Sequence, residues 1–132
     1  PDGTVLVMHH APLPQVQDAT VLWSLEEQDA LADIVRGSDV RLILSGHFHQ
    51  TASGSFAGVP VWVGTSMAYT QDVTAGRTLR GQAGGQGFSL VSLYADQVVV
   101  TAVPLTQFEA VHPPVTPHDT AERVAARAAA AR

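Results

Sequence analysis

The chain has 132 residues, of which 45% are hydrophobic and 14% are charged, a composition that supports one folded domain with a buried core. Seven basic against twelve acidic residues give a formal net charge of −5, which argues against a protein that coats a nucleic-acid polymer through a basic face. Cys is absent, so disulfides and thiolate metal sites are excluded, and no apolar run is long enough to span a membrane.

The first predicted element is a strand that follows a turn. Pro1, Asp2 and Gly3 have the composition of a turn, and the apolar run at residues 4–8 is typical of a strand buried on both faces. We therefore expect the chain to begin inside a larger fold. The absence of a signal-peptide pattern leads us to expect a cytoplasmic protein.

A helix and a second strand are predicted next. The prolines at 12 and 14 stop the first strand, and residues 13–23 are expected to form a loop. Ser24 and Glu27 have the spacing of a helix capping box, and Gly37 suits the position after the helix ends. The apolar residues 40–44 predict a strand parallel to the first, which makes a βαβ unit.

The remaining chain predicts antiparallel hairpins and a tail. Residues 51–63 and 88–103 each have two strand patterns around a short turn, while residues 70–87 are polar and Gly-rich and predict a mobile surface loop. The fold class is therefore α/β, a βαβ unit followed by hairpins. Residues 1–104 are assigned to the folded domain, and residues 105–132 to a Pro-rich strap and a helical tail that Asp119 could cap.

Histidines follow both strands of the predicted βαβ unit. The carboxyl ends of parallel strands form the functional edge of such sheets, so His9, His47 and His49 are expected near one another. On an extended backbone His47 and His49 point the same way, whereas His9 and His10 point oppositely, so His9 is the better metal ligand and His10 a supporting residue. Imidazole is a common ligand of zinc, iron and manganese.

Other polar residues are expected to play smaller parts. His112 and His118 lie in the strap and tail and are interpreted as solvated, and Asp39 as structural. Asp72 follows a strand end on the side of the predicted site and is a minor candidate for contact with substrate or its water. Three neutral imidazoles can hold one metal ion, but two neighbouring cations also need carboxylates, so the residues predict only part of a two-metal site.

Two motifs resemble the calcineurin-like metallophosphoesterases. A strand that ends in Val-Met-His9-His10-Ala-Pro precedes a helix and a second strand that ends in Gly46-His47-Phe48-His49. With residues 68–73 and the final hairpin, the sequence is most similar to the actinobacterial class III cyclic-nucleotide phosphodiesterases. The resemblance implies a β-sandwich flanked by helices, of which this chain is the C-terminal half.

The resemblance also implies the cofactor and the roles of the histidines. It implies two divalent or trivalent ions (Fe, Mn or Zn), with His9 and His47 as ligands of the second metal and His49 as a ligand of the first. The resemblance implies that His10 is a catalytic residue that supports the site without binding metal. The family's Asp-x-His, Gly-Asp and Gly-Asn-His motifs do not occur in this sequence, so the bridging carboxylate and the Asn ligand are missing from it.

The activity implied by the resemblance is hydrolysis of a small phosphodiester, a 3′,5′-cyclic nucleotide, by a hydroxide that bridges the metals. The isolated chain is expected to be inactive and to need the N-terminal half of the same enzyme as its partner. Self-association into a homodimer stays open. Two other readings also stay open: a non-catalytic fragment that binds metal or a partner, and a glycerophosphodiesterase of the same superfamily.

Overall fold

The computed structural model describes residues 3–130, so part of the turn predicted at residues 1–3 lies outside the described residues. A four-stranded sheet with the order β1-β2-β4-β3 forms the centre of the molecule. β1 and β4 both run parallel to β2, and β3 pairs antiparallel with β4. The strands are β1 (Thr4–Val7), β2 (Val40–Ser45), β3 (Ala52–Phe56) and β4 (Val59–Val63). The predicted βαβ unit and first hairpin are confirmed.

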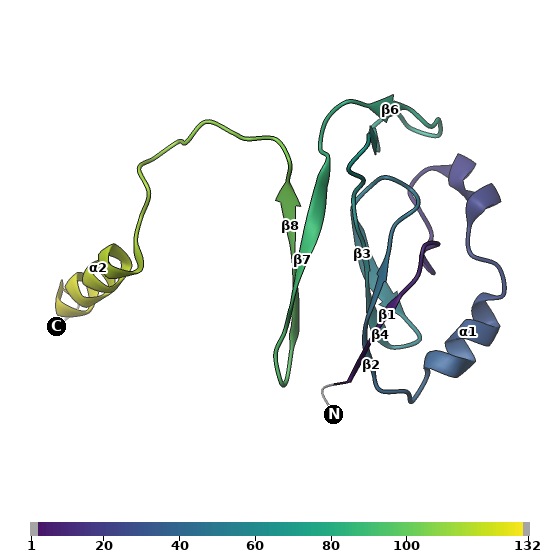
Figure 1. Ribbon diagram of the computed structural model, residues 1–132, viewed down its shortest axis with the longest axis horizontal. Helices are drawn as coiled ribbons and strands as arrows, with labels where there is room; N and C mark the ends of the chain where they lie inside the picture. The colour runs from purple at the N-terminus through teal and green to yellow at the C-terminus, as the bar shows by residue number, and fades with distance from the viewer. Residues whose placement is uncertain (1–2, 131–132) are drawn as a thin grey trace.

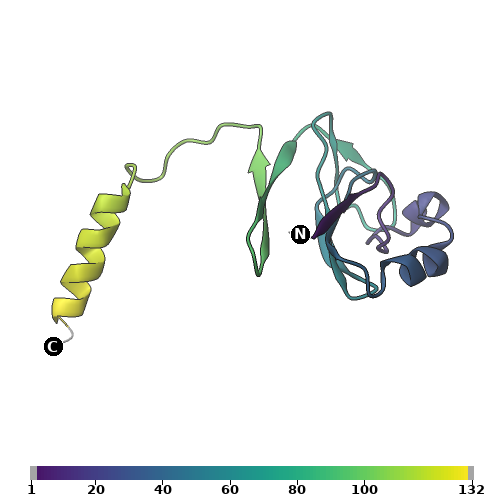
Figure 2. The same ribbon diagram turned by 60° about the horizontal axis from the view of Figure 1, so that its bottom comes forward.

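The molecule is layered around this sheet. The helices η1 (Asp18–Trp23) and α1 (Gln28–Val35) lie on one side of it, and the hairpin of β7 (Gly87–Leu93) and β8 (Val98–Pro104) lies on the other (Figures 1 and 2). The seven residue pairs of β7 and β8 confirm the second predicted hairpin. The combination of β-sheets and helices confirms the predicted α/β class.

The core lies between the sheet and α1. Val59, Val61 and Val63 alternate with more exposed residues along β4, so one face of this strand is buried and the other faces the hairpin. Ile43 of β2 is fully buried, and Val35 of α1 is 2% exposed in the same cluster. Burial of these side chains fixes the register of the sheet, because a slip of one residue would expose them.

The first helix begins later than predicted, because the capping box of Ser24 and Glu27 does not form. The N–H of Ser24 donates to the Val21 carbonyl and closes η1, a 3₁₀-helix within the segment predicted as a loop. Glu27 adopts a left-handed backbone with φ 53°, and α1 starts at the next residue. Gly37, with φ 71°, lies just after the helix as predicted.

The polar segment predicted as a surface loop contains a small hairpin, β5 (Thr70–Gln71) and β6 (Gly81–Gln82). Asp72 is buried at its end, where its carboxylate accepts hydrogen bonds from Thr74 and pairs with Arg80. The fully buried Gln17 donates from its side-chain amide to the carbonyls of Asp72 and Thr78, 3.0 Å each. These contacts attach the hairpin to the body.

The strap leads away from the body to α2 (Pro117–Ala130), which has no buried residue (Figure 1). The helix cap lies earlier than predicted. Thr116, not Asp119, precedes the helix, and the two form a reciprocal capping box: the Asp119 N–H donates to the Thr116 hydroxyl, and the Thr116 N–H donates to the Asp119 carboxylate at 2.8 Å. Among residues 3–130, no helix combines the length and apolar character of a membrane span.

Candidate metal site

The candidate site lies where β1 and β2 end. His9 comes two residues after β1, and His47 two residues after β2. The Met8 N–H donates to the Leu44 carbonyl at 2.9 Å, and the Gly46 N–H donates to the His9 carbonyl at 3.1 Å, so the parallel pairing continues past the strand ends. This places His9 and His47 at one sheet edge, as expected from the topology.

Three imidazoles meet at this edge. His9, His10 and His47 each offer a ring nitrogen, and these nitrogens all lie within 4.8 Å of one another. Nδ1 of His47 is 3.1 Å from Nε2 of His9. The rings of His10 and His47 are stacked, with centroids 4.1 Å apart. We call these three residues the histidine cluster.

The geometry of the cluster fits a bound cation. Two nitrogens that each lie about 2.1 Å from one ion at a tetrahedral angle are about 3.4 Å apart, close to the observed separation of the His9 and His47 nitrogens. The same 3.1 Å also suits a hydrogen bond between the two neutral rings. A cation bound between these two nitrogens would take the place of the proton that such a hydrogen bond shares.

His10 lies closer to the other histidines than strand alternation predicts. β1 ends at Val7, so the backbone at residues 8–10 is no longer a strand, and its neighbours need not point to opposite sides. The ring of His10 is half-buried and rests on His47. The supporting role expected for His10 is therefore compatible with its direct contact with His47.

His47 and His49 do not share one direction, because the backbone between them is not extended. Both residues are left-handed, with φ 77° and φ 54°, and Phe48 between them is buried in the core. A left-handed backbone costs of order 1–3 kcal/mol at a residue with a side chain, and such residues gather at functional sites. The positive φ angles of this turn belong to the two histidines and not to Gly46.

His49 lies apart from the cluster and is oriented by Tyr69. Its Nδ1 is 3.1 Å from the Tyr69 carbonyl oxygen, and the two rings lie with centroids 4.3 Å apart. A carbonyl acceptor assigns the ring proton to Nδ1, which leaves Nε2 with a free lone pair. Metal-binding histidines commonly have this arrangement.

The surroundings of His47 favour its neutral form. Burial lowers the pKa of His47 below its usual value, and the nearby imidazoles of His10, His9 and His49 lower this pKa further. A neutral imidazole is the form that binds a metal ion. No carboxylate belongs to the cluster within residues 3–130, so the described residues offer imidazoles without the negative charge that two adjacent cations need.

The remaining polar candidates lie outside the cluster. The Asp72 carboxylate is occupied by Thr74 and Arg80. Asp39 accepts a 3.0 Å hydrogen bond from the Thr4 hydroxyl, which confirms its structural role. His112 and His118 are exposed in the strap and tail, where His112 contacts the Pro113 carbonyl and His118 pairs with Glu122 at 3.3 Å. None of these residues adds a ligand to the site.

Sequence reasoning missed a small hollow beside the cluster. It measures about 220 Å³, and His47 and His49 form part of its wall. The other lining residues come from η1, the His-Phe-His turn and the β5–β6 region: Thr20, Trp23, Phe48, Tyr69, Gln71 and Leu79. Trp23, at the end of η1, is 49% exposed. The signal for this hollow in the sequence was Trp23, an aromatic residue at the end of residues 13–23, a segment that has no apolar periodicity.

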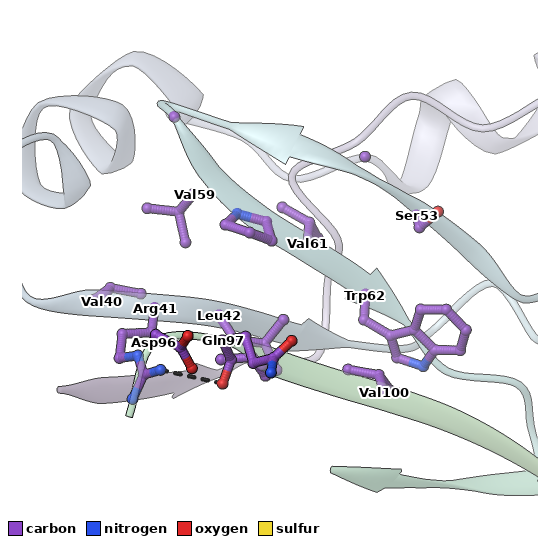
Figure 3. A pocket seen from close by; sticks show the side chains of 14 residues that line it. Val40, Arg41, Leu42, Ser53, Val59, Val61, Trp62, Asp96, Gln97 and Val100 are labelled. Atoms are coloured by element: carbon purple, nitrogen blue, oxygen red, sulfur yellow. Dashed lines mark hydrogen bonds between the residues drawn. The ribbon is translucent and has the colours of Figure 1, made fainter. Parts of the chain in front are cut away.

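A larger hollow of about 660 Å³ lies elsewhere, between the sheet and β8 (Figure 3). Val40 and Val59 begin their strands there, so this hollow lies toward the opposite end of the sheet from the histidines. Its lining is mainly apolar, and Trp62, one of the lining residues, donates to the Ser89 hydroxyl of β7 at 2.8 Å. The hollow separates two packed layers and offers no cluster of ligands.

No family model matches the chain. It is homologous to actinobacterial proteins that are named cyclic nucleotide phosphodiesterases. One is the "probable cyclic nucleotide phosphodiesterase" of Rhodococcus erythropolis, 47% identical over 128 residues, or 96% of this chain and 42% of the relative. Another is a "cAMP/cGMP dual specificity phosphodiesterase" of Mycobacterium tuberculosis, 45% identical over 95% of this chain and 40% of the relative. The chain thus spans about two fifths of the length of these relatives, and the predicted resemblance to actinobacterial enzymes of this type is confirmed.

Proposed function

We propose that this chain supplies part of the active site of a metal-dependent phosphodiesterase that hydrolyses 3′,5′-cyclic nucleotides to nucleoside monophosphates. The observation that carries the proposal is the meeting of His9, His10 and His47 at one sheet edge. Two relatives whose names specify cyclic nucleotides, with 45–47% identity over 95% or more of the chain, support the same substrate class.

The histidines divide into two groups around the proposed metals. His9 and His47 would hold one ion through the nitrogens that face each other, and His49 would offer Nε2 to a second ion of the Fe, Mn or Zn type. When bound, such ions neutralise phosphate charge and make water more acidic. In this proposal the site is the two-metal site of a calcineurin-like metallophosphoesterase.

The chain's own residues position the ligands and the substrate. The stacked ring of His10 restricts rotation of His47 and adds a polar nitrogen beside it. The Tyr69 carbonyl holds the ring of His49, and the buried Phe48 anchors the turn that carries both histidines. These contacts fix the rings before any ligand arrives, which reduces the cost of binding.

The missing carboxylates imply a second contribution to the site. Two metals close together need anionic ligands, and the cluster within residues 3–130 has none. We propose that an N-terminal part of the same enzyme supplies them, in line with the two fifths of the relatives that this chain spans. The isolated chain would then bind metal but would not turn over substrate.

Hydrolysis of cyclic AMP by the chain alone and by a longer protein that contains it tests this proposal. We expect turnover only in the longer protein, with loss in His47→Ala and in His49→Ala. His112→Ala is the matched control, because this histidine lies in the strap. Absence of phosphodiesterase activity in the longer protein would reject the function, and full turnover by the isolated chain would reject the division of the site.

A further inference from the structure

The small hollow beside His47 and His49 has the features of a ring-binding pocket. Its volume, about 220 Å³, is below the roughly 300–1,000 Å³ of pockets that enclose a whole drug-sized ligand, so it suits one ring system of a larger molecule. Trp23 and Tyr69 line it and are 49% and 45% exposed, so both present aromatic surface to solvent. Half-exposed aromatic side chains are effective platforms for planar rings.

The hollow is continuous with the candidate site. His47 belongs to the histidine cluster and also lines the hollow. A molecule with its phosphate at the cluster can therefore place an attached ring system in the hollow. The N–H of Gln71 donates to the His49 carbonyl at 2.9 Å, so the hollow and the turn that carries the histidines are fixed to each other.

Gln71 gives the hollow a polar recognition group. Its side-chain oxygen is buried and has no hydrogen-bond partner among residues 3–130. A buried amide oxygen without a partner is unfavourable, so rotation of the amide toward a bound donor is energetically favoured. The amide carries a donor and an acceptor, and both purines present a donor beside an acceptor on their base-pairing edge.

We propose that this hollow is the nucleobase subsite of the phosphodiesterase, with Trp23 and Tyr69 as stacking walls and Gln71 as the group that hydrogen-bonds the base. The inference rests on the proposed function for its substrate class. In this arrangement the base fixes the sugar and phosphate against the histidine cluster. The amide can serve adenine or guanine by turning through half a rotation, so Gln71 accepts either purine in this arrangement.

Tryptophan fluorescence tests the subsite without any turnover. Trp62 lies between the sheet and the second hairpin, so Trp62→Phe leaves Trp23 as the sole tryptophan. We expect AMP to quench Trp23 in a saturable way, and ribose 5-phosphate, which lacks the base, to leave it unchanged. Equal responses to both compounds, or no response to AMP, would overturn the proposal.

Variants identify the residues that bind the base. Tyr69→Ala and Gln71→Ala are each expected to raise the Kd for AMP roughly tenfold, the size of one stacking or hydrogen-bonding contribution. Gln97→Ala is the matched control, because this glutamine lines the larger hollow. An unchanged Kd in both test variants would overturn the assignment of these side chains.

A second readout separates this inference from the proposed function. In the longer protein, we compare kcat/KM for cyclic AMP with kcat/KM for methyl p-nitrophenyl phosphate, which has no base. Gln71→Ala should lower the ratio of the two values about tenfold, and Gln97→Ala should preserve it. If the parent hydrolyses neither compound, the proposed function fails; if it hydrolyses both and the ratio is unchanged in Gln71→Ala, the subsite fails alone.

Discussion

The body of the molecule and its tail contrast in what determines their structure. In the body, the side chains of β2, β4 and α1 interlock, and Ile43 and Val63 are 0% exposed. In the tail, α2 buries no side chain, and Val124 is 63% exposed although it is apolar. The body is specified by long-range packing, whereas the tail depends on local hydrogen bonds.

The position of the candidate site follows from this difference. The histidines of the cluster lie at the ends of two packed strands, and the buried Phe48 anchors the turn between His47 and His49. Within residues 3–130, the contacts of the strap and tail histidines are local, His112 with the Pro113 carbonyl and His118 with Glu122. A site held by the core has the rigidity that metal coordination requires.

The largest expected effect is the loss of core packing in Ile43→Ala. Truncation of a fully buried Ile removes transfer free energy and leaves a cavity, which together cost about 2–5 kcal/mol. Ile34→Ala is the matched control: this residue is 74% exposed on α1, and its replacement should change the free energy of unfolding by less than about 0.5 kcal/mol. Urea unfolding measures both, and equal midpoints would contradict the packing described for the body.

The next expected effect concerns metal binding. His47→Ala removes the ring that contacts both His9 and His10, so the affinity for Zn²⁺ should fall on the order of 100-fold. His118→Ala changes a tail histidine that pairs with Glu122 at 3.3 Å, and should leave the affinity unaltered. Calorimetric titration of each variant with Zn²⁺ makes the comparison. Equal affinities in the two variants would place the metal outside the cluster.

The sequence predicted the body best where burial repeats along the chain. The apolar runs at residues 4–8 and 40–44 and the alternation in β4 determined the strands, and the parallel topology brought His9 and His47 to one edge. These features depend on periodicity and chain direction, which a sequence displays directly. The tail helix was also predictable, since its composition and terminal residues favour a helix.

The local geometry of the site was less predictable. The left-handed backbones of Glu27, His47 and His49 follow from how their neighbours pack. Histidine is enriched in this region relative to most residues, but that enrichment is too small to mark particular positions in a sequence. The stacking of His10 on His47 requires β1 to end at Val7, and pattern analysis rarely fixes an element's end within two residues. The hollow beside His49 combines three separate segments, so no single motif indicates it.

A smaller effect is expected where the β5–β6 hairpin joins the body. Hydrogen bonds from the side chain and backbone of Thr74, and then the Arg80 guanidinium, lower the pKa of Asp72 below its ordinary value. This carboxylate therefore stabilises the folded state above its unfolded pKa, about 3.9, and the contribution is lost as pH falls through the lower folded value. Asp72→Asn should lower the urea midpoint at pH 7 and have less effect near pH 2, whereas Asp33→Asn, in an exposed pair on α1, should change little at either pH. Equal losses for Asp72→Asn at both pH values would show that its charge is not involved.

The smallest expected effect separates the tail from the body. Thr116→Ala removes the hydroxyl that accepts from the Asp119 N–H and donates to its carboxylate, and loss of such a cap costs about 1 kcal/mol of helix stability. Helical ellipticity should fall, but the cooperative unfolding of the body should keep its midpoint, because α2 buries nothing against the sheet. Thr120→Ala, within the same helix, controls for loss of a threonine that is not the cap. A shift of the main unfolding transition in Thr116→Ala would mean that the tail contributes to the body's stability, and the contrast between long-range packing and local hydrogen bonding would then no longer describe this molecule.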